Sequence, residues 1–304
     1  MKKEVTAMHI CDGHCDTMKK MAQGLPIDFS FEDAAKNDGF LQVFAYFSKD
    51  GETCPEEALH TVQDFSSEAK ADIVYTPRHA LSVLRSGRLG ALLSLENSCC
   101  LGEDVEALYH FYNLGIRAIS LTWNGENQFA HGAECPRGGL KNAGRDLISL
   151  ADKLGILIDV SHLNEQSFYD VISFGRGKIF ASHSSSYAIN PHPRNLTDRQ
   201  IKALYDCGGI ICVCPYPPFL TGGTEATCAD FVRHLRHISH LTDGLGVALG
   251  SDMDGVKYSI PGLKTTRDLI NFPECLRQYN FSDYEIQNIF SCNFERFLEK
   301  SIKK

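Results

Sequence analysis

The chain has 304 residues, of which 43% are hydrophobic and 22% charged, a composition typical of a soluble globular protein with a large core. Its formal net charge of -8 argues against binding to nucleic acid or to an anionic membrane surface. No internal boundary or low-complexity linker interrupts the sequence. We therefore expect one domain over residues 1–304.

The N-terminus and the cysteines both bear on location. Lys2 and Lys3 are followed by no apolar stretch, because Glu4 and Asp12 interrupt it, and no run elsewhere is long enough for a membrane-spanning helix. The twelve cysteines include no C-x-x-C pair, so we expect reduced, mostly buried thiols rather than a disulfide framework. These features predict a cytoplasmic protein.

Eight apolar runs are predicted to be strands. The first begins with the apolar residues 8–10 and runs into a polar motif that ends at residue 16. The others cover residues 40–47, 89–95, 116–121, 156–160, 178–181, 210–213 and 247–249. Near-continuous apolar runs are typical of a parallel sheet that is covered on both faces.

Helices are predicted between these strands from proline starts, glycine stops and amphipathic spacing. They cover residues 55–72, 78–85, 103–114, 146–154, 165–174, 198–207, 231–241 and 266–302. This alternation predicts an α/β protein, a (β/α)8 barrel of the TIM type. A doubly wound open sheet is the alternative, but it would prefer a glycine-rich phosphate loop after the first strand.

The motif that ends the first strand carries two metal-binding side chains. His14 and Asp16 are two residues apart, so on an extended chain they point to the same side. An imidazole and a carboxylate form half of a coordination sphere for a divalent metal such as zinc.

Similar side chains follow other predicted strands, namely Glu96, His162, His183 and Asp252. In a barrel the carboxyl ends of the strands open on one face, so these residues should converge there. Three histidines and three carboxylates exceed the needs of one catalytic zinc and suit two metals, with one carboxylate as a bridge and another as a proton acceptor. Two cations can hold a hydroxide and polarise a carbonyl, so the predicted chemistry is hydrolysis.

Five motifs resemble those of the membrane (renal) dipeptidase family of zinc metallopeptidases, and the resemblance covers nearly the whole chain from about residue 9. They are Asp12-Gly-His-x-Asp16, Asp159-Val-Ser-His162, Ser182-His-Ser-Ser185, Arg194-Asn195 and Gly250-Ser-Asp-Met-Asp-Gly255. The resemblance implies a distorted (β/α)8 barrel of the metallo-dependent hydrolase group. It also implies a dinuclear zinc site that cleaves dipeptides, including those with a C-terminal D-residue.

The resemblance also assigns the metal ligands. His14 and Asp16 would bind one zinc ion, and His162 and His183 would bind the other. Glu96 would bridge the two Zn²⁺ ions.

The same resemblance gives roles in catalysis and substrate binding. Asp252 would handle the proton, and Arg194 would pair with the α-carboxylate of the substrate, with Tyr216 assisting. Arginine suits this role because its planar guanidinium matches a carboxylate.

One position departs from the family pattern. Family peptidases commonly have a histidine after the fourth strand that is thought to stabilise the oxyanion, and this chain has Trp123 there. Asn124, Asn127 and His131 are nearby candidates to replace it, and we place Trp123 and Asn124 in the substrate site. Because tryptophan offers one donor and more bulk, we expect weak cleavage of ordinary dipeptides and a preference for small side chains.

Two other functions stay open. One is a related amidohydrolase, such as an amidase, lactonase or deaminase, although deaminases typically open with His-x-His and this chain has His-x-Asp. The other is an inactive metal-binding relic, against which Asp252 and Arg194 count. The leading prediction is a zinc dipeptidase whose partner is a small dipeptide, with a homodimer left open.

Overall fold

The computed structural model describes residues 8–175 and 178–301. The predictions that rest on Lys2 and Lys3, and the end of the last predicted helix at residue 302, lie outside the described residues.

Eight parallel strands close into a barrel, which confirms the predicted (β/α)8 architecture. They are β1 (Ile10–Cys15), β2 (Phe40–Phe47), β4 (Leu89–Glu96), β5 (Ile116–Ser120), β6 (Leu157–Asp159), β7 (Ile179–Ser184), β8 (Ile211–Val213) and β9 (Val247–Leu249). β1 pairs with both β2 and β9, and the pairing of β2 with β4 closes the ring. This closure excludes the open-sheet alternative.

A ninth short strand, β3 (Asp72–Ile73), corrects the prediction of a helix up to residue 72. The helix α3 (Pro55–Glu68) ends earlier because Ala69 has an extended backbone. β3 then pairs with the beginning of β4 at Gly90 and Ala91, below the point where β5 pairs with β4.

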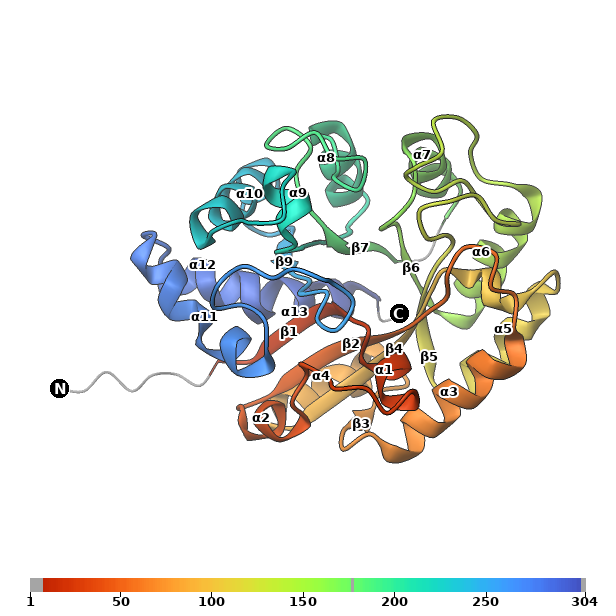
Figure 1. Ribbon diagram of the computed structural model, residues 1–304, viewed down its shortest axis with the longest axis horizontal. Helices are drawn as coiled ribbons and strands as arrows, with labels where there is room; N and C mark the ends of the chain where they lie inside the picture. The colour runs from red at the N-terminus through yellow and green to blue at the C-terminus, as the bar shows by residue number, and fades with distance from the viewer. Residues whose placement is uncertain (1–7, 176–177, 302–304) are drawn as a thin grey trace.

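Helices surround the barrel in Figure 1. Besides α3 they are α1 (Thr17–Ala22), α2 (Phe31–Lys36), α4 (Pro77–Arg85), η1 (Ser98–Leu101), η2 (Val105–Ala107), α5 (Leu108–Asn113), α6 (Asn142–Leu154), α7 (Glu165–Phe174), α8 (Asp198–Asp206), α9 (Pro217–Thr221), α10 (Cys228–Leu241), α11 (Thr266–Gln278), α12 (Asp283–Gln287), η3 (Asn288–Cys292) and α13 (Asn293–Ser301). The sequence did not predict α1, α2 or α9, which are too short to carry a clear periodic pattern. The single helix predicted from residue 266 is interrupted at Asn280, which has a φ of 59°.

Neighbouring strand residues belong to two different apolar clusters. In β8, for example, Ile211 and Val213 join a cluster shared with the surrounding helices, whereas Cys212 joins a second cluster. All eight barrel strands contribute to this second cluster, which also contains Phe294 and Phe297 of α13. It therefore fills the barrel interior at the end opposite the carboxyl ends of the strands.

The cysteines differ from the prediction at one pair. Cys228 and Cys275 form a disulfide between α10 and α11, and ten cysteines are free. The pair is 47 residues apart in sequence, so only the packing of the two helices brings it together. Within residues 8–175 and 178–301, no helix is long and apolar enough to cross a membrane.

Candidate metal centre

The carboxyl ends of four barrel strands bring the predicted ligands together. His14 and His183 lie within β1 and β7, Glu96 is the last residue of β4, and His162 follows β6 by three residues. Asp16 comes directly after β1. The barrel therefore brings together five residues from four distant segments of the sequence.

Glu96 contacts other predicted metal ligands on both sides. Its Oε1 atom lies 2.7 Å from His162 Nε2 and 3.6 Å from His183 Nε2. Its Oε2 atom lies 3.2 Å from His14 Nε2, which in turn lies 3.7 Å from Asp16 Oδ1. Two groups with metal-binding geometry result, and they share Glu96.

Several side-chain atoms between these predicted ligands are buried without a hydrogen-bond partner. They are His14 Nε2, Asp16 Oδ1 and Glu96 Oε2. An unpaired buried polar atom costs about 1–3 kcal/mol, so such a cluster calls for an explanation. Imidazole and carboxylate donors are suitable ligands for a divalent metal, and the residues present therefore fit the metal that the motifs predict.

The electrostatics of the centre agree with this fit. Burial, reinforced by the nearby Asp16 carboxylate, raises the pKa of Glu96 to about 8. Burial also raises the pKa of Asp252 to about 6, again with a contribution from Asp16. The pKa values of His162 and His183 are lowered, first by burial, which favours the neutral imidazoles that bind metals. Burial would lower the pKa of His14, but the Glu96 and Asp16 carboxylates beside it raise the pKa well above its ordinary value. A cation between these carboxylates would relieve the same repulsion.

The backbone is bent at three points around the centre. Asn97, His162 and Asp252 have φ values of 67°, 72° and 56°, a left-handed conformation that is unfavourable for residues other than glycine. Hydrogen bonds hold two of these bends: Asn97 N–H donates to Ser120 Oγ, and Asp252 N–H donates to the carbonyl oxygen of His14. Such strain is typical of functional sites.

Asn124 contacts His162, one of the predicted metal ligands. Its Oδ1 atom lies 2.8 Å from His162 Nδ1, so it accepts the Nδ1–H of that imidazole. The proton on Nδ1 leaves the lone pair on Nε2, the nitrogen that faces Glu96.

Two buried aspartates below the centre were quoted in the motifs but received no role from the sequence. Asp12 accepts hydrogen bonds from the backbone and hydroxyl of Ser251, next to Asp252. Asp159 accepts hydrogen bonds from Ser182, next to His183. A carboxylate inside an apolar strand must have partners, and this signal could have identified both residues.

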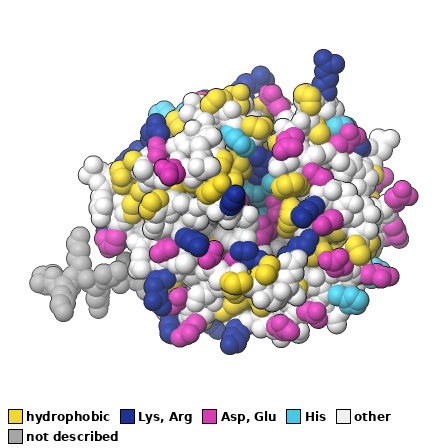
Figure 2. Space-filling view, in the orientation of Figure 1, with side chains coloured by type: hydrophobic (Ala, Val, Ile, Leu, Met, Phe, Trp, Pro, Cys, Tyr) yellow, Lys and Arg dark blue, Asp and Glu magenta, His cyan; other side chains and the backbone are white. Residues whose placement is uncertain are grey.

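A cavity of about 760 Å³ opens above the ligands. Figure 2 shows a hollow near the middle of this face, with histidine and acidic side chains inside it and basic side chains around it. Arg194, Tyr216, Trp123, Asn124 and Asp252 all line the cavity. The predicted substrate-binding positions and the predicted proton carrier therefore face one space.

Arg194 is a buried cation with spare donors. It is 5% exposed, and its Nη2 donates to the carbonyl oxygen of His183 over 3.3 Å, whereas its Nε has no hydrogen-bond partner. The guanidinium lies 5.3 Å from the ring centre of Phe219, which also packs edge-on against Tyr216. This packing holds the guanidinium at the wall of the cavity.

Trp123 contributes an aromatic wall. Its ring centre lies 5.3 Å from that of Phe47 and 6.2 Å from that of His162. Asn127 instead bonds to the carbonyl oxygen of Leu121, and His131 contacts the carbonyl oxygen of Gly139. Neither Asn127 nor His131 is among the described residues that line the cavity.

The comparison with known families agrees with the fold and the motifs. The model of the membrane dipeptidase family, peptidase family M19, matches residues 2–303. The chain belongs to this family.

Two fungal relatives share about three residues in ten with the chain where they align. The chain is 27% identical to the dipeptidase tcpJ of Claviceps purpurea over 80% of this chain and 58% of that protein. It is 31% identical to the dipeptidase aclJ of Aspergillus oryzae over 63% of this chain and 46% of that protein. The chain thus spans about half the length of these curated relatives.

Solved structures share the barrel. A metallo peptidase from Rhodobacter sphaeroides, liganded with a phosphinate mimic of the dipeptide L-Ala-D-Ala, superposes with a TM-score of 0.87 at 21% identity and covers 97% of this chain and 100% of that chain. The probable dipeptidase PvdM from Pseudomonas aeruginosa superposes with a TM-score of 0.81 at 18% identity over 97% of this chain and 96% of that chain. At these identities the similarity concerns the fold.

Proposed function

We propose that the chain is a dinuclear zinc dipeptidase. The observation that carries the proposal is the position of Glu96, whose two carboxylate oxygens face different ligand groups, at the base of the cavity that Arg194 lines. Membership of the membrane dipeptidase family supports the same activity.

In this proposal His14, Asp16 and Glu96 hold one zinc ion, and Glu96, His162 and His183 hold the other. When bound, the two ions supply Lewis acidity that activates water and polarises the peptide carbonyl. Asn124 holds the His162 imidazole in the correct tautomer, so it would position a ligand in addition to its predicted contact with substrate.

Asp252 is proposed to move the proton. It lies at the cavity wall, and its pKa of about 6 is near neutral, where a group can both accept and release a proton. It would take a proton from the attacking water and deliver it to the leaving amine.

Arg194 is proposed to bind the α-carboxylate of the substrate. A buried guanidinium with an unpaired Nε needs an anionic partner, and a carboxylate matches its planar donors. Tyr216 lines the same wall and would assist. This recognition selects peptides with a free C-terminus close to the scissile bond, which describes a dipeptide.

Trp123 is proposed to narrow the cavity beside His162. We expect small substrate side chains and slow turnover of ordinary dipeptides, because one indole N–H is the only donor that the side chain offers. The ligand of the Rhodobacter sphaeroides structure makes dipeptides with a C-terminal D-residue worth testing.

The experiment is a substrate screen with metal-free protein and with the same protein reloaded with zinc. Dipeptides of L,L and L,D configuration should release free amino acids only after zinc is added. Dipeptide amides, N-acyl amino acids and lactones form the comparison set. Preferential cleavage of amides or lactones would contradict the dipeptidase proposal and favour the related amidohydrolase.

A cytoplasmic location, one domain and a homodimer are further proposals. Ten free cysteines favour a reducing compartment, whereas the Cys228–Cys275 bond argues against it. Thiol counting in unfolded protein taken directly from cells under alkylation tests the location, since twelve reactive thiols would support it and ten would contradict it. Sedimentation and limited proteolysis test assembly and domain number.

A further inference from the structure

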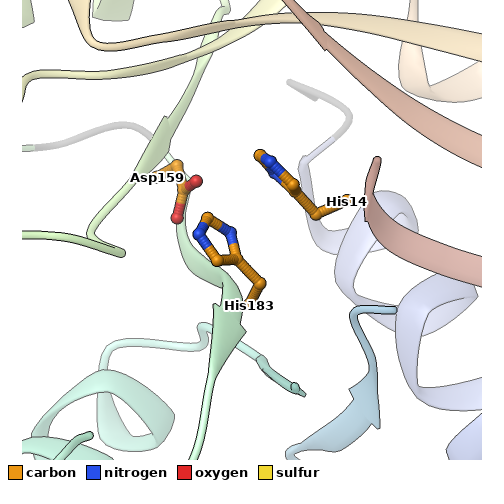
Figure 3. Close-up of side chains that lie close together, drawn as sticks. All are labelled: His14, Asp159 and His183. Atoms are coloured by element: carbon orange, nitrogen blue, oxygen red, sulfur yellow. The ribbon is translucent and has the colours of Figure 1, made fainter. Parts of the chain in front are cut away.

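One hydroxyl lies beneath both halves of the metal centre. Ser182 Oγ lies 2.5 Å from Asp159 Oδ2, 2.6 Å from His183 Nδ1 and 3.3 Å from His14 Nδ1. Figure 3 shows Asp159, His183 and His14 converging from three different strands. Of the two groups that share Glu96, His14 belongs to one and His183 to the other, so the contact joins these two groups from below.

The hydrogen-bond directions follow from the number of protons. Asp159 Oδ1 accepts the backbone N–H groups of Ser161 and Ser182, each over 2.9 Å, and Asp159 Oδ2 accepts the hydroxyl proton of Ser182. A serine oxygen then has two lone pairs left and no proton. Ser161 Oγ also lies 3.4 Å from this oxygen, but the imidazole nitrogens at 2.6 Å and 3.3 Å are closer. The oxygen therefore accepts from His183 and His14, so Nδ1 carries a proton in both imidazoles and Nε2 is left to bind metal.

We propose that Asp159 and Ser182 are a positioning pair that fixes the tautomer of His14 and His183 together, so that both metal ions depend on one hydroxyl. The inference rests on the proposed metal centre. Each imidazole directs its free Nε2 toward Glu96, at 3.2 Å for His14 and 3.6 Å for His183. His162 is supported separately, through Asn124.

His14, Asp159 and His183 also come close enough together to suggest a third metal site. The hydroxyl of Ser182 contacts all three side chains and already pairs Asp159 with both imidazoles. A hydrogen-bond network therefore accounts for this cluster without another ion.

The barrel contains a matched control. Ser251 Oγ donates to Asp12 Oδ2 over 2.5 Å, and Ser251 N–H donates to Asp12 Oδ1 over 2.7 Å, as in the Asp159–Ser182 pair. Its other partners are backbone groups of His14 and Met253, and no described imidazole nitrogen is among them. Ser251→Ala thus removes an equivalent buried hydroxyl without changing the hydrogen bonds that set the tautomer of any histidine.

The first test compares Ser182→Ala with Ser251→Ala by zinc competition against a chelator. Ser182→Ala should bind both ions about 10–100-fold more weakly, which is the usual effect of losing a group that orients a ligand. Ser251→Ala should bind both ions as the unmodified protein does. Equal affinities in the two variants, or an unchanged affinity in Ser182→Ala, would overturn the proposal.

The second test is Asp159→Asn, which keeps the size of the side chain and so remains informative if Ser182→Ala does not fold. The two backbone N–H groups keep the amide oxygen on their side, so the new NH₂ faces Ser182 and turns its hydroxyl toward His183. The proton of His183 should then move to Nε2, which ¹⁵N NMR of the metal-free protein detects. Affinity should fall first for the ion held by His162 and His183. An unchanged His183 tautomer would contradict the proposal.

These results separate two failures. Unmodified protein that binds no zinc would refute the proposed function. If the unmodified protein binds two zinc ions and Ser182→Ala and Asp159→Asn bind them with the same affinity, only the positioning pair is refuted.

Discussion

The Nε2 atoms of His162 and His183 lie 2.8 Å apart, although the Nδ1 atom of each imidazole already has another partner, Asn124 in one case and Ser182 in the other. Burial lowers the pKa of both imidazoles, so they face each other as neutral rings. Glu96 Oε1 approaches the same point. Two nitrogen lone pairs and a carboxylate oxygen that converge in this way are arranged for a cation.

Asp252→Asn tests proton transfer. The variant keeps the shape of the side chain and removes its ability to accept a proton, so kcat should fall by about 10²–10⁴-fold while zinc binding is retained. Steady-state kinetics and metal analysis on the same preparation measure both effects. Turnover equal to that of the unmodified protein would refute the role of Asp252.

Arg194→Gln tests recognition of the carboxylate. Losing one partner of a buried charged pair costs about 2–4 kcal/mol, so kcat/KM for a free dipeptide should fall by about 30–1000-fold. The amide of the same dipeptide should be a poor substrate of the unmodified protein, and the difference between the two substrates should largely vanish in the variant. If the unmodified protein cleaves both equally well, Arg194 does not bind the carboxylate.

Trp123→His tests the position that departs from the family pattern. If a missing oxyanion donor limits the rate, the variant should gain up to about 10²–10³-fold in kcat on a simple dipeptide. A loss of activity would instead show that Trp123 shapes the site for another substrate. Unchanged kinetics with lower stability would make it a packing residue against Phe47.

The sequence was sufficient to predict the barrel because its strands are continuous apolar runs separated by helices. It did not reveal β3, because two residues that pair with only the beginning of β4 leave almost no pattern. It also did not reveal the Cys228–Cys275 bond, which depends on how α10 and α11 pack. The spacing of residues within one segment does not predict contacts between segments that are distant in the sequence.

The same distinction applies to the site. His14, Glu96, His162 and His183 could be selected because metal-binding side chains recur at strand ends, where a barrel must bring them together. The partners of their outer nitrogens could not be selected, because a serine or an asparagine has no special signature in sequence. Asn124 was accordingly predicted only as a substrate contact; it does line the cavity, and its oxygen also accepts a hydrogen bond from His162.

His234 provides a test of stability against pH outside the site. It is buried, its Nδ1 accepts the N–H of Ser186, and burial lowers its pKa to about 4. The folded state thus favours the neutral ring, and the associated stability is complete above pH 6.5 and is lost as pH falls toward 4. The loss should reach about 3 kcal/mol, since each pKa unit corresponds to about 1.4 kcal/mol.

Urea unfolding at several pH values between 7 and 4 measures this effect. His234→Gln should be less stable at pH 7 and should show a flatter decline on acidification. His240→Gln, an exposed position on the same helix, is the control and should keep the original slope. Parallel slopes for the unmodified protein and His234→Gln would refute the assignment.

The most direct test of the proposed dinuclear centre is a zinc titration of metal-free protein with elemental analysis, repeated for Glu96→Gln. The unmodified chain should bind about two zinc ions, because two ligand groups share one carboxylate. Glu96→Gln should weaken both ions together, since each of its oxygens faces a different group. Saturation at one ion, or a Glu96→Gln variant that loses only one of two, would contradict a centre bridged by Glu96.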